Sequence, residues 1–268
     1  MPSIRNQDSH IQLPKSFQKP FSKRCTKIID DHSQKIDEVA YYDLKDSSIK
    51  QSSIKELGTK HGYYSKEIEL VLSNYVEKPI SSLRDKSYQI KKGFDVTFTD
   101  ADCLNFINYI IWSSLRNSKK AKELEEKLNI PKNQQVTPVR EAILGAICVY
   151  QEKFLQRFNL LNSFLVGIVS GDSERSFVLP QSGFFIVDWP SHSSSNVFVI
   201  PFLPQISIGL VPNQFKKYYP KRIVTLSSDD ITLFNRTAFL FEQHSGQGFV
   251  IGLQEELIRF QSDLNWKS

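Results

Sequence analysis

The chain has few of the residues that build zinc sites and disulfide frameworks. Its 268 residues include three cysteines and one methionine. Cys25, Cys103 and Cys148 are far apart, odd in number and without C-x-x-C spacing. Neither a structural zinc site nor a disulfide framework is therefore predicted, and a reducing cytoplasm is the expected compartment.

The sequence also lacks a long hydrophobic run. Residues 142–150 (AILGAICVY) and 160–169 (LLNSFLVGIV) are too short or too interrupted to span a bilayer. The opening MPSIRNQDSH is polar and contains no apolar segment of the kind that a signal peptide needs. We therefore expect a soluble protein without a membrane partner.

Strong catalytic signatures are absent as well. The chain contains no G-x-x-x-x-G-K-[ST] phosphate loop, no G-x-S-x-G elbow, no H-E-x-x-H zinc motif and no glycine-rich dinucleotide fingerprint. No enzyme class that carries one of these signatures is indicated. Function has to be argued from weaker signals.

The composition that remains is that of an ordinary globular protein. Hydrophobic residues make up 40% of the chain and charged residues 24%, which is enough apolar material to bury a sizeable core. Lysine and arginine exceed aspartate and glutamate by 34 to 29. This excess permits an anionic partner without requiring one.

The hydrophobic pattern changes its period twice along the chain. Residues 1–60 alternate as in a small β layer, residues 61–163 place apolar side chains at helical spacing, and residues 164–268 return to short apolar runs before one final helix. This order predicts a single α+β domain over 1–268. We expect a central mixed or antiparallel sheet built from the N-terminal and C-terminal segments, with the middle third as a helical layer.

Local signals predict where the helices begin and end. Ser65 is the expected N-cap of the first helix, and Pro79 should end or kink that helix. Thr99 and Asp102 have capping-box spacing at the start of the second helix. Asn235 falls in the middle of the final helix, so it must be either exposed or hydrogen-bonded to a specific partner.

A few titratable residues suit acid–base or metal chemistry. His10 can exchange a proton near physiological pH, or it can tie a loop to backbone carbonyls. Glu69 and Glu77, on one predicted helix, could hold a divalent ion such as Mg²⁺ or share acid–base work, although a first-turn glutamate also satisfies the helix dipole. Arg116 can clamp a phosphate, or can simply complement the end of its helix.

Two basic stretches bear on an anionic partner. Residues 9–29 contain no acid, and FKKYYPKR (215–222) lies inside an acid-free run from 190 to 228. Cations mixed with tyrosines suit a phosphate backbone and stacked bases, while a solvated basic face is the simpler explanation. The second stretch supplies four predicted substrate contacts: Lys216, Lys217, Lys221 and Arg222.

Read in order, these residues resemble a widespread, mainly bacterial family known only as domain of unknown function 4238. Its members open with a His-Tyr-Val-Pro-like element, a basic residue and an L-x-x-F ending. A Tyr-Asp strand follows, then a YYS-x-x-x-E helix start with a second glutamate, then a helix with an F-I pair and a later arginine. The matching positions here are YYDLK and residues His10, Pro14, Lys15, Phe21, Tyr63, Tyr64, Ser65, Glu69, Glu77, Phe106, Ile107 and Arg116.

The resemblance continues to the end of the chain with some departures. The family's T-S-D-N-P turn, I-P-L-x-P strand and Asn-bearing helix look like LPQSGFF, VIPFLP and LFNRTAF, which include Ser182 and Asn235. The opening element is one residue longer here, and Gln181 and Ser182 stand where the family has an aspartate. Polar residues recurring as a set in one order imply a shared site.

The resemblance and the basic surface lead to three hypotheses. The first is a bacterial toxin or phage-defence effector that cuts nucleic acid, with RNA favoured. His10 and Glu69 would move protons, and Arg116 and Lys15 would stabilise phosphate charge, while Glu77 supports a metal or the histidine. Ser182 and Asn235 would contact the substrate.

The second hypothesis is a non-enzymatic binding or sensing module of a bacterial defence system, with a protein partner from that system. The third is a hydrolase or transferase that acts on a small phosphorylated ligand. The oligomeric state is left open.

Overall fold

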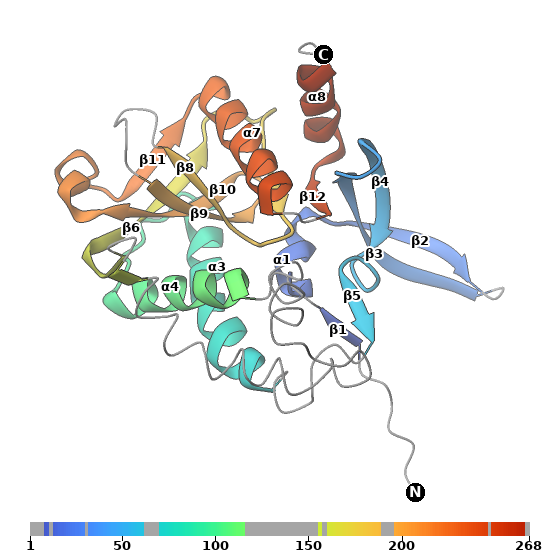
Figure 1. The fold of residues 1–268 in the computed structure, drawn as a ribbon, viewed down its shortest axis with the longest axis horizontal. Coiled ribbons are helices and arrows are strands. Elements are labelled where there is room, and N and C mark those ends of the chain that lie inside the picture. Colours follow the sequence, from blue (N-terminus) through green and yellow to red (C-terminus); the bar gives the residue numbers. More distant parts are fainter. Residues whose placement is uncertain are drawn as a thin grey trace, which may run out of the picture.

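The structure is a computed structural model, and it describes residues 8–10, 13–29, 32–61, 70–115, 155–156, 160–188, 196–245 and 248–265. Strands dominate the two ends of the chain, and the described part of the middle contributes helices (Figure 1). The α+β class predicted from the sequence is therefore confirmed.

One five-stranded sheet, the central sheet, is built entirely from residues 163–226. Its strand order is β11-β6-β10-β9-β8, and all neighbours are antiparallel except the parallel pair of β11 and β6. The strands are β6 (Ser163–Ser170), β8 (Phe185–Asp188), β9 (Asn196–Leu203), β10 (Ile206–Pro212) and β11 (Ile223–Leu226). The middle strands are almost continuously apolar because both faces of this sheet are covered.

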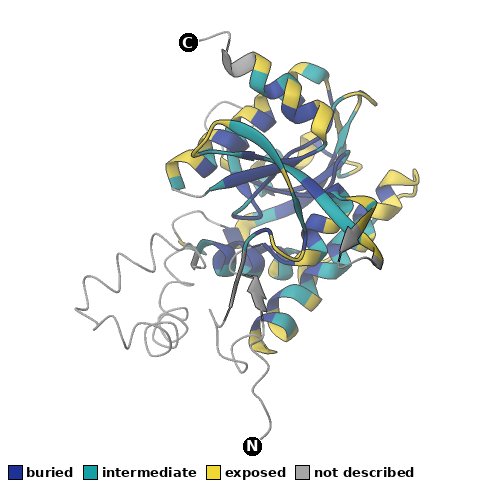
Figure 2. Ribbon diagram, turned by 90° about the vertical axis from the view of Figure 1, so that its right-hand side faces the viewer, coloured by how far each residue is buried: buried dark blue, intermediate teal, exposed yellow. Residues whose placement is uncertain are grey.

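Helices cover the two faces of the central sheet (Figure 1). One face packs against α3 (Lys78–Lys91) and α4 (Asp100–Leu115), and the other packs against α7 (Ser228–Ser245). Successive residues of a strand point to opposite faces, so Leu165 joins the cluster under α3 and α4 while Phe164 and Val166 join the cluster under α7. Buried residues accordingly concentrate in this sheet and on the helix faces against it (Figure 2).

Gly167 lets α3 approach the central sheet closely. A Cβ atom at this position would lie 2.7 Å from Cδ1 of Ile90 and 3.7 Å from Cγ1 of Ile223. Because Gly167 has no side chain, the C-terminal end of α3 can pack beside β11, the edge strand of the central sheet.

The second, outer sheet combines strands from both ends of the chain. It contains β2 (Lys23–Ile29), β3 (His32–Asp43), β4 (Ser48–Ser53), β7 (Leu179–Pro180) and β12 (Phe249–Gly252), all antiparallel. N-terminal and C-terminal segments thus share a sheet, as predicted. One sheet was predicted, whereas the structure has two five-stranded sheets. Residues 163–226 give only β7 to the outer sheet and form the central sheet by themselves.

Strand β3 carries two different strands along one of its edges. Glu38 pairs with residues of both β2 and β4, so these two strands lie on opposite edges of β3. Ala40 pairs with residues of both β4 and β12, so β12 also lies opposite β4. Consequently β2 ends its pairing and β12 begins its own along the same edge, between Glu38 and Ala40.

Pro79 does not end the first predicted helix. A π-helical turn, Ser73–Glu77, leads directly into α3, and Pro79 follows this irregular turn at the start of α3. Leu72 and Val76 are buried, whereas Tyr75 is 70% exposed. The predicted cap Ser65 lies outside the described residues.

The capping box of α4 is confirmed. The Thr99 N–H donates to Oδ2 of Asp102 over 2.7 Å, and the Asp102 N–H donates to Oγ1 of Thr99 over 3.2 Å. Leu104 of this helix is 52% exposed, whereas Phe106, Ile107, Ile110 and Ile111 are buried.

Four further elements lie outside the two five-stranded sheets and the helices that cover the central sheet. A short ladder joins β1 (Asp8–His10) to β5 (Thr59–His61), and α1 (Lys15–Gln18) follows β1. The chain closes with α8 (Gln254–Asn265), which the sequence analysis missed by treating α7 as the last helix. Helix α8 follows β12 with only Leu253 between them, so no turn signal marks its start.

Candidate nucleic-acid interface

The predicted catalytic set is only partly described. His10 ends β1, where it pairs with Thr59 of β5. Glu69 and Arg116 lie outside the described residues. A His, Glu and Arg site therefore stays a prediction.

The structure describes Glu77, the residue that was predicted to support a metal ion. Glu77 ends the π-helical turn before α3 and is partly buried. Among the described residues, no group of three or more His, Cys, Asp and Glu side chains is arranged to hold a metal ion. Lys15, a predicted substrate contact, begins α1 and is exposed.

Asn235 is buried in α7 and hydrogen-bonded to specific partners, which decides between the two alternatives that the sequence left open. Its Oδ1 accepts the Val178 N–H over 3.0 Å. Its Nδ2 donates to the Ser176 carbonyl over 2.8 Å and to Oε1 of Glu256 over 3.0 Å. With 1% of its surface exposed, Asn235 lies in the interior and not in a substrate cleft.

Glu256, at the start of α8, is the centre of this polar cluster. The Arg175 guanidinium donates from Nη2 to Oε1 over 2.8 Å, and from Nε to both carboxylate oxygens over 3.2 Å. The Ser176 N–H donates to Oε2 over 3.1 Å. The cluster ties α7 and α8 to residues 175–178, and each carboxylate oxygen has at least two donors.

Ser182 is also buried. Its N–H donates to Oε1 of Glu242 over 2.9 Å. Its hydroxyl donates to the Phe184 carbonyl over 2.7 Å and also lies within hydrogen-bonding distance of Glu242 Oε1, so these two acceptors share one hydroxyl proton.

Burial raises the pKa of Glu242 to about 7, although the two bonds from Ser182 oppose this rise. Its Oε2 atom has no hydrogen-bond partner within the part of the chain that the structure describes. Glu242 is thus a carboxyl group that the fold keeps largely neutral up to about pH 7.

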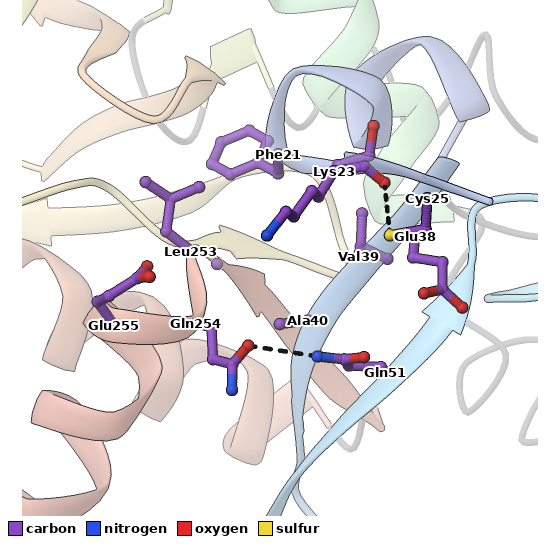
Figure 3. Close-up of a pocket in the computed structure, with 12 residues that line it drawn as sticks. Phe21, Lys23, Cys25, Glu38, Val39, Ala40, Gln51, Leu253, Gln254 and Glu255 are labelled. Atoms are coloured by element: carbon purple, nitrogen blue, oxygen red, sulfur yellow. Dashed lines mark hydrogen bonds between the residues drawn. The ribbon is translucent and has the colours of Figure 1, made fainter. Parts of the chain in front are cut away.

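A hollow of about 160 Å³ lies where β2 and β12 meet along the edge of β3 (Figure 3). Its apolar wall includes Phe21, Val39 and Leu253. Its polar lining comprises Ser22, Lys23, Cys25, Glu38, Gln51, Gln254 and Glu255.

The hollow is not equipped for nucleophilic catalysis. Lys27 hydrogen-bonds Glu38 and lowers the pKa of that carboxyl, so Glu38 is ionised and cannot donate a proton near neutral pH. The Cys25 thiol donates to the Lys23 carbonyl over 3.7 Å, and no histidine lines the hollow to activate it.

The predicted basic stretch gathers at one corner of the central sheet, beside the end of α3. Arg222 joins the two parts, because its Nη1 donates over 3.2 Å to the carbonyl of Phe98 in the loop between α3 and α4. Helix α3 ends just before this loop with two exposed lysines. We call the six cations of this place the basic corner: Lys91, Lys92, Lys216, Lys217, Lys221 and Arg222.

Arg222 is held firmly in this corner. Its backbone adopts a left-handed φ of 51°, which is uncommon for a residue with a side chain. Its carbonyl accepts the Gly167 N–H over 2.8 Å, and its guanidinium lies 5.8 Å from the ring centre of Phe164. Arg222 is therefore an anchored cation, and the exposed lysines are arranged around it.

Carboxylates beside the basic corner are fewer than its cations. Asp95 is the only acid in residues 91–99, and residues 213–222 contain none. Asp100 and Asp102 begin α4 directly after this loop, and Asp102 is paired with Lys86. Asp172 and Asp229 lie at the opposite end of β11, beside Leu226, roughly 10 Å along the strand. The six cations therefore give the corner an excess of positive charge.

Sequence reasoning found the stretch 215–222 but missed the contribution of α3. Lys91 and Lys92 precede Gly93, so they look like an ordinary basic helix end before a C-terminal glycine. Only the contact between Arg222 and Phe98 shows that the two basic segments form one surface.

Comparisons with known proteins found no matching family model, no matching curated protein and no matching solved structure. Within the described ranges, the structure contains no helix with the length and apolar character needed to cross a membrane.

Proposed function

We propose that this protein binds the phosphate backbone of nucleic acid through the basic corner. The single observation that supports this is six cations from two distant segments, joined by Arg222, which outnumber the carboxylates beside them. Lysine and arginine side chains that replace the counterions around phosphates are the main source of such affinity. The five lysines of the corner are exposed, which suits a long polyanion better than a small molecule enclosed in a pocket.

The test compares matched sets of lysine substitutions. Lys216, Lys217 and Lys221 are each changed to Ser, which leaves the structural Arg222 in place. The slope of log K against log salt should become less steep by about 2 to 3, and affinity should fall alike for all sequences. The control changes three exposed cations outside both basic stretches to Ser: Lys35, Lys45 and Arg236.

The control protein should bind like the parent. If the basic-corner variant keeps the parent's salt slope, nucleic acid does not bind at this surface. Fluorescence anisotropy with a labelled oligonucleotide gives both quantities, and circular dichroism shows that each variant is folded.

Cleavage would extend this proposal from binding to catalysis. The support is the predicted set of His10, Glu69 and Arg116 together with the basic surface, which suit a bacterial toxin or phage-defence nuclease; the family resemblance supplies these positions but no activity. Pure protein is incubated with total RNA, plasmid and single-stranded DNA in Mg²⁺, Mn²⁺ or EDTA. Cleavage that His10→Ala abolishes supports the nuclease, and retention without cleavage supports a binding module.

A further inference from the structure

Exposed aromatic side chains accompany the basic corner. The described residues include four tyrosines or phenylalanines that are strongly exposed, and three of them lie at this corner. The three are Tyr88 at 43%, Phe94 at 59% and Tyr218 at 54% exposed, and the fourth, Tyr75, lies at the other end of the α3 segment. From this we infer that the basic corner takes single-stranded nucleic acid in preference to duplex, an inference that rests on the proposed function.

Cations lie close to these rings in the local structure. Tyr88 lies three and four residues before Lys91 and Lys92 at the end of α3, and residues at this spacing share one face of a helix. The Lys217 ammonium lies 4.9 Å from the ring centre of Tyr218. Phe94 follows Lys92 by two positions. Cations and aromatic rings therefore occur together at the corner.

Phe94 is exposed, although Phe98 in the same loop is buried. Phe98, four residues later, is 4% exposed and packs in the core, and its ring also receives the Lys86 ammonium at 5.7 Å. Phe94 instead follows α3 directly, with its N–H bonded to the Gln89 carbonyl over 3.0 Å. The loop thus buries the Phe98 ring in the core and leaves the Phe94 ring exposed to solvent.

This combination suits a single strand for a physical reason. A duplex hides the faces of its bases in the stack and offers mainly phosphates, so exposed rings add nothing to its binding. A single strand offers unpaired bases, whose faces stack on aromatic side chains whatever the sequence. A lysine beside the ring can contact the adjoining phosphate at the same time.

The experiment measures affinity for four labelled ligands of equal length: single-stranded RNA, single-stranded DNA, a blunt duplex, and an abasic strand that has phosphates without bases. The variants are Tyr88→Ala, Phe94→Ala and Tyr218→Ala, with Tyr75→Ala as the matched control at an exposed tyrosine away from the corner. Because all four rings are exposed, these substitutions should leave thermal unfolding unchanged.

The parent should bind both single strands more tightly than the duplex and the abasic strand. Each corner variant should lose roughly 5- to 100-fold in affinity for single strands and nothing for the abasic strand, and Tyr75→Ala should bind like the parent. The RNA and DNA arms show which sugar is preferred.

Two results would overturn the inference while the proposed function survives. One is equal affinity for the single strand and the abasic strand, and the other is corner variants that bind like Tyr75→Ala although the lysine variant loses affinity. If the parent binds none of the four ligands, the proposed function itself is wrong.

Discussion

Glu256 and Glu242 are both buried carboxyl groups on neighbouring helices, yet their surroundings differ. Glu256 in α8 is 1% exposed and accepts hydrogen bonds from Arg175, Ser176 and Asn235. Glu242 in α7 is fully buried, and Ser182 is its only hydrogen-bond partner in the described chain.

The difference shows what decides the charge of a buried acid. Removing a carboxylate from water is costly unless cations and dipoles replace the lost hydration. A guanidinium, a backbone N–H and an amide do this for Glu256. Glu242 has one serine, so protonation is the cheaper solution and its pKa rises to about 7.

The largest effect should come from removing the cation beside Glu256. Arg175→Met leaves a carboxylate buried without its counter-charge, so the free energy of unfolding should fall by roughly 3–5 kcal/mol. Urea unfolding at pH 7 measures this. Arg259→Met is the control, because the Arg259–Glu174 pair is exposed and should contribute at most about 1 kcal/mol.

If Arg175→Met lowers the free energy of unfolding no more than Arg259→Met does, then burial does not make the Arg175–Glu256 pair more stabilising than the Arg259–Glu174 pair. The double variant Arg175→Met, Glu256→Gln should recover part of the lost stability, since it removes the unpaired charge.

Glu242→Gln should change how stability depends on pH. The pKa is raised in the folded state, so the stability that Glu242 contributes is fully present below its ordinary value of 4.5 and is lost as pH rises through about 7. The loss amounts to roughly 3 kcal/mol. The neutral glutamine cannot ionise, so the variant should gain stability relative to the parent between pH 5 and pH 8.

Urea unfolding of parent and variant at several pH values in this window measures that gain. Parallel curves for the two proteins would show that Glu242 does not titrate in this window and would remove the contrast with Glu256.

The smallest effect should come from Ser182→Ala. The bonds from Ser182 lower the pKa of Glu242, so loss of the hydroxyl should move that pKa above about 7 and cost about 1 kcal/mol near neutral pH. The midpoint of the pH-dependent loss of stability reports the shift. Thr237→Ala, an exposed-face change on the same helix, should leave the midpoint in place, and a downward movement in Ser182→Ala would contradict the proposed hydrogen bonding.

Local features of the fold could be predicted from the sequence. The capping box of Thr99 and Asp102, the strands between 163 and 226, and helix α7 around Asn235 all follow from contacts between residues close in the chain. The stretch 215–222 was visible for the same reason, because its charges are consecutive. Such features depend on spacing and side-chain chemistry alone.

Roles that depend on distant partners could not be predicted. Asn235 and Ser182 were expected to contact substrate, and the structure places both in the interior. Asn235 bonds Val178, 57 residues away, and Glu256, 21 residues away, while Ser182 bonds Glu242, 60 residues away. Likewise Arg222 reaches the Phe98 carbonyl across 124 positions, which joins two basic segments that look unrelated in the sequence.

The sequence by itself determined the α+β class, the start of α4 and the net positive charge of the chain, since these are set by local pattern and composition. The tertiary structure alone decided that β2 and β12 share an edge of β3, that Glu256 is surrounded by donors while Glu242 is not, and that six cations form one corner. A charge or polar group acquires its role from what the fold places within a few ångströms of it, and that distance is set by packing between segments that the chain order keeps apart.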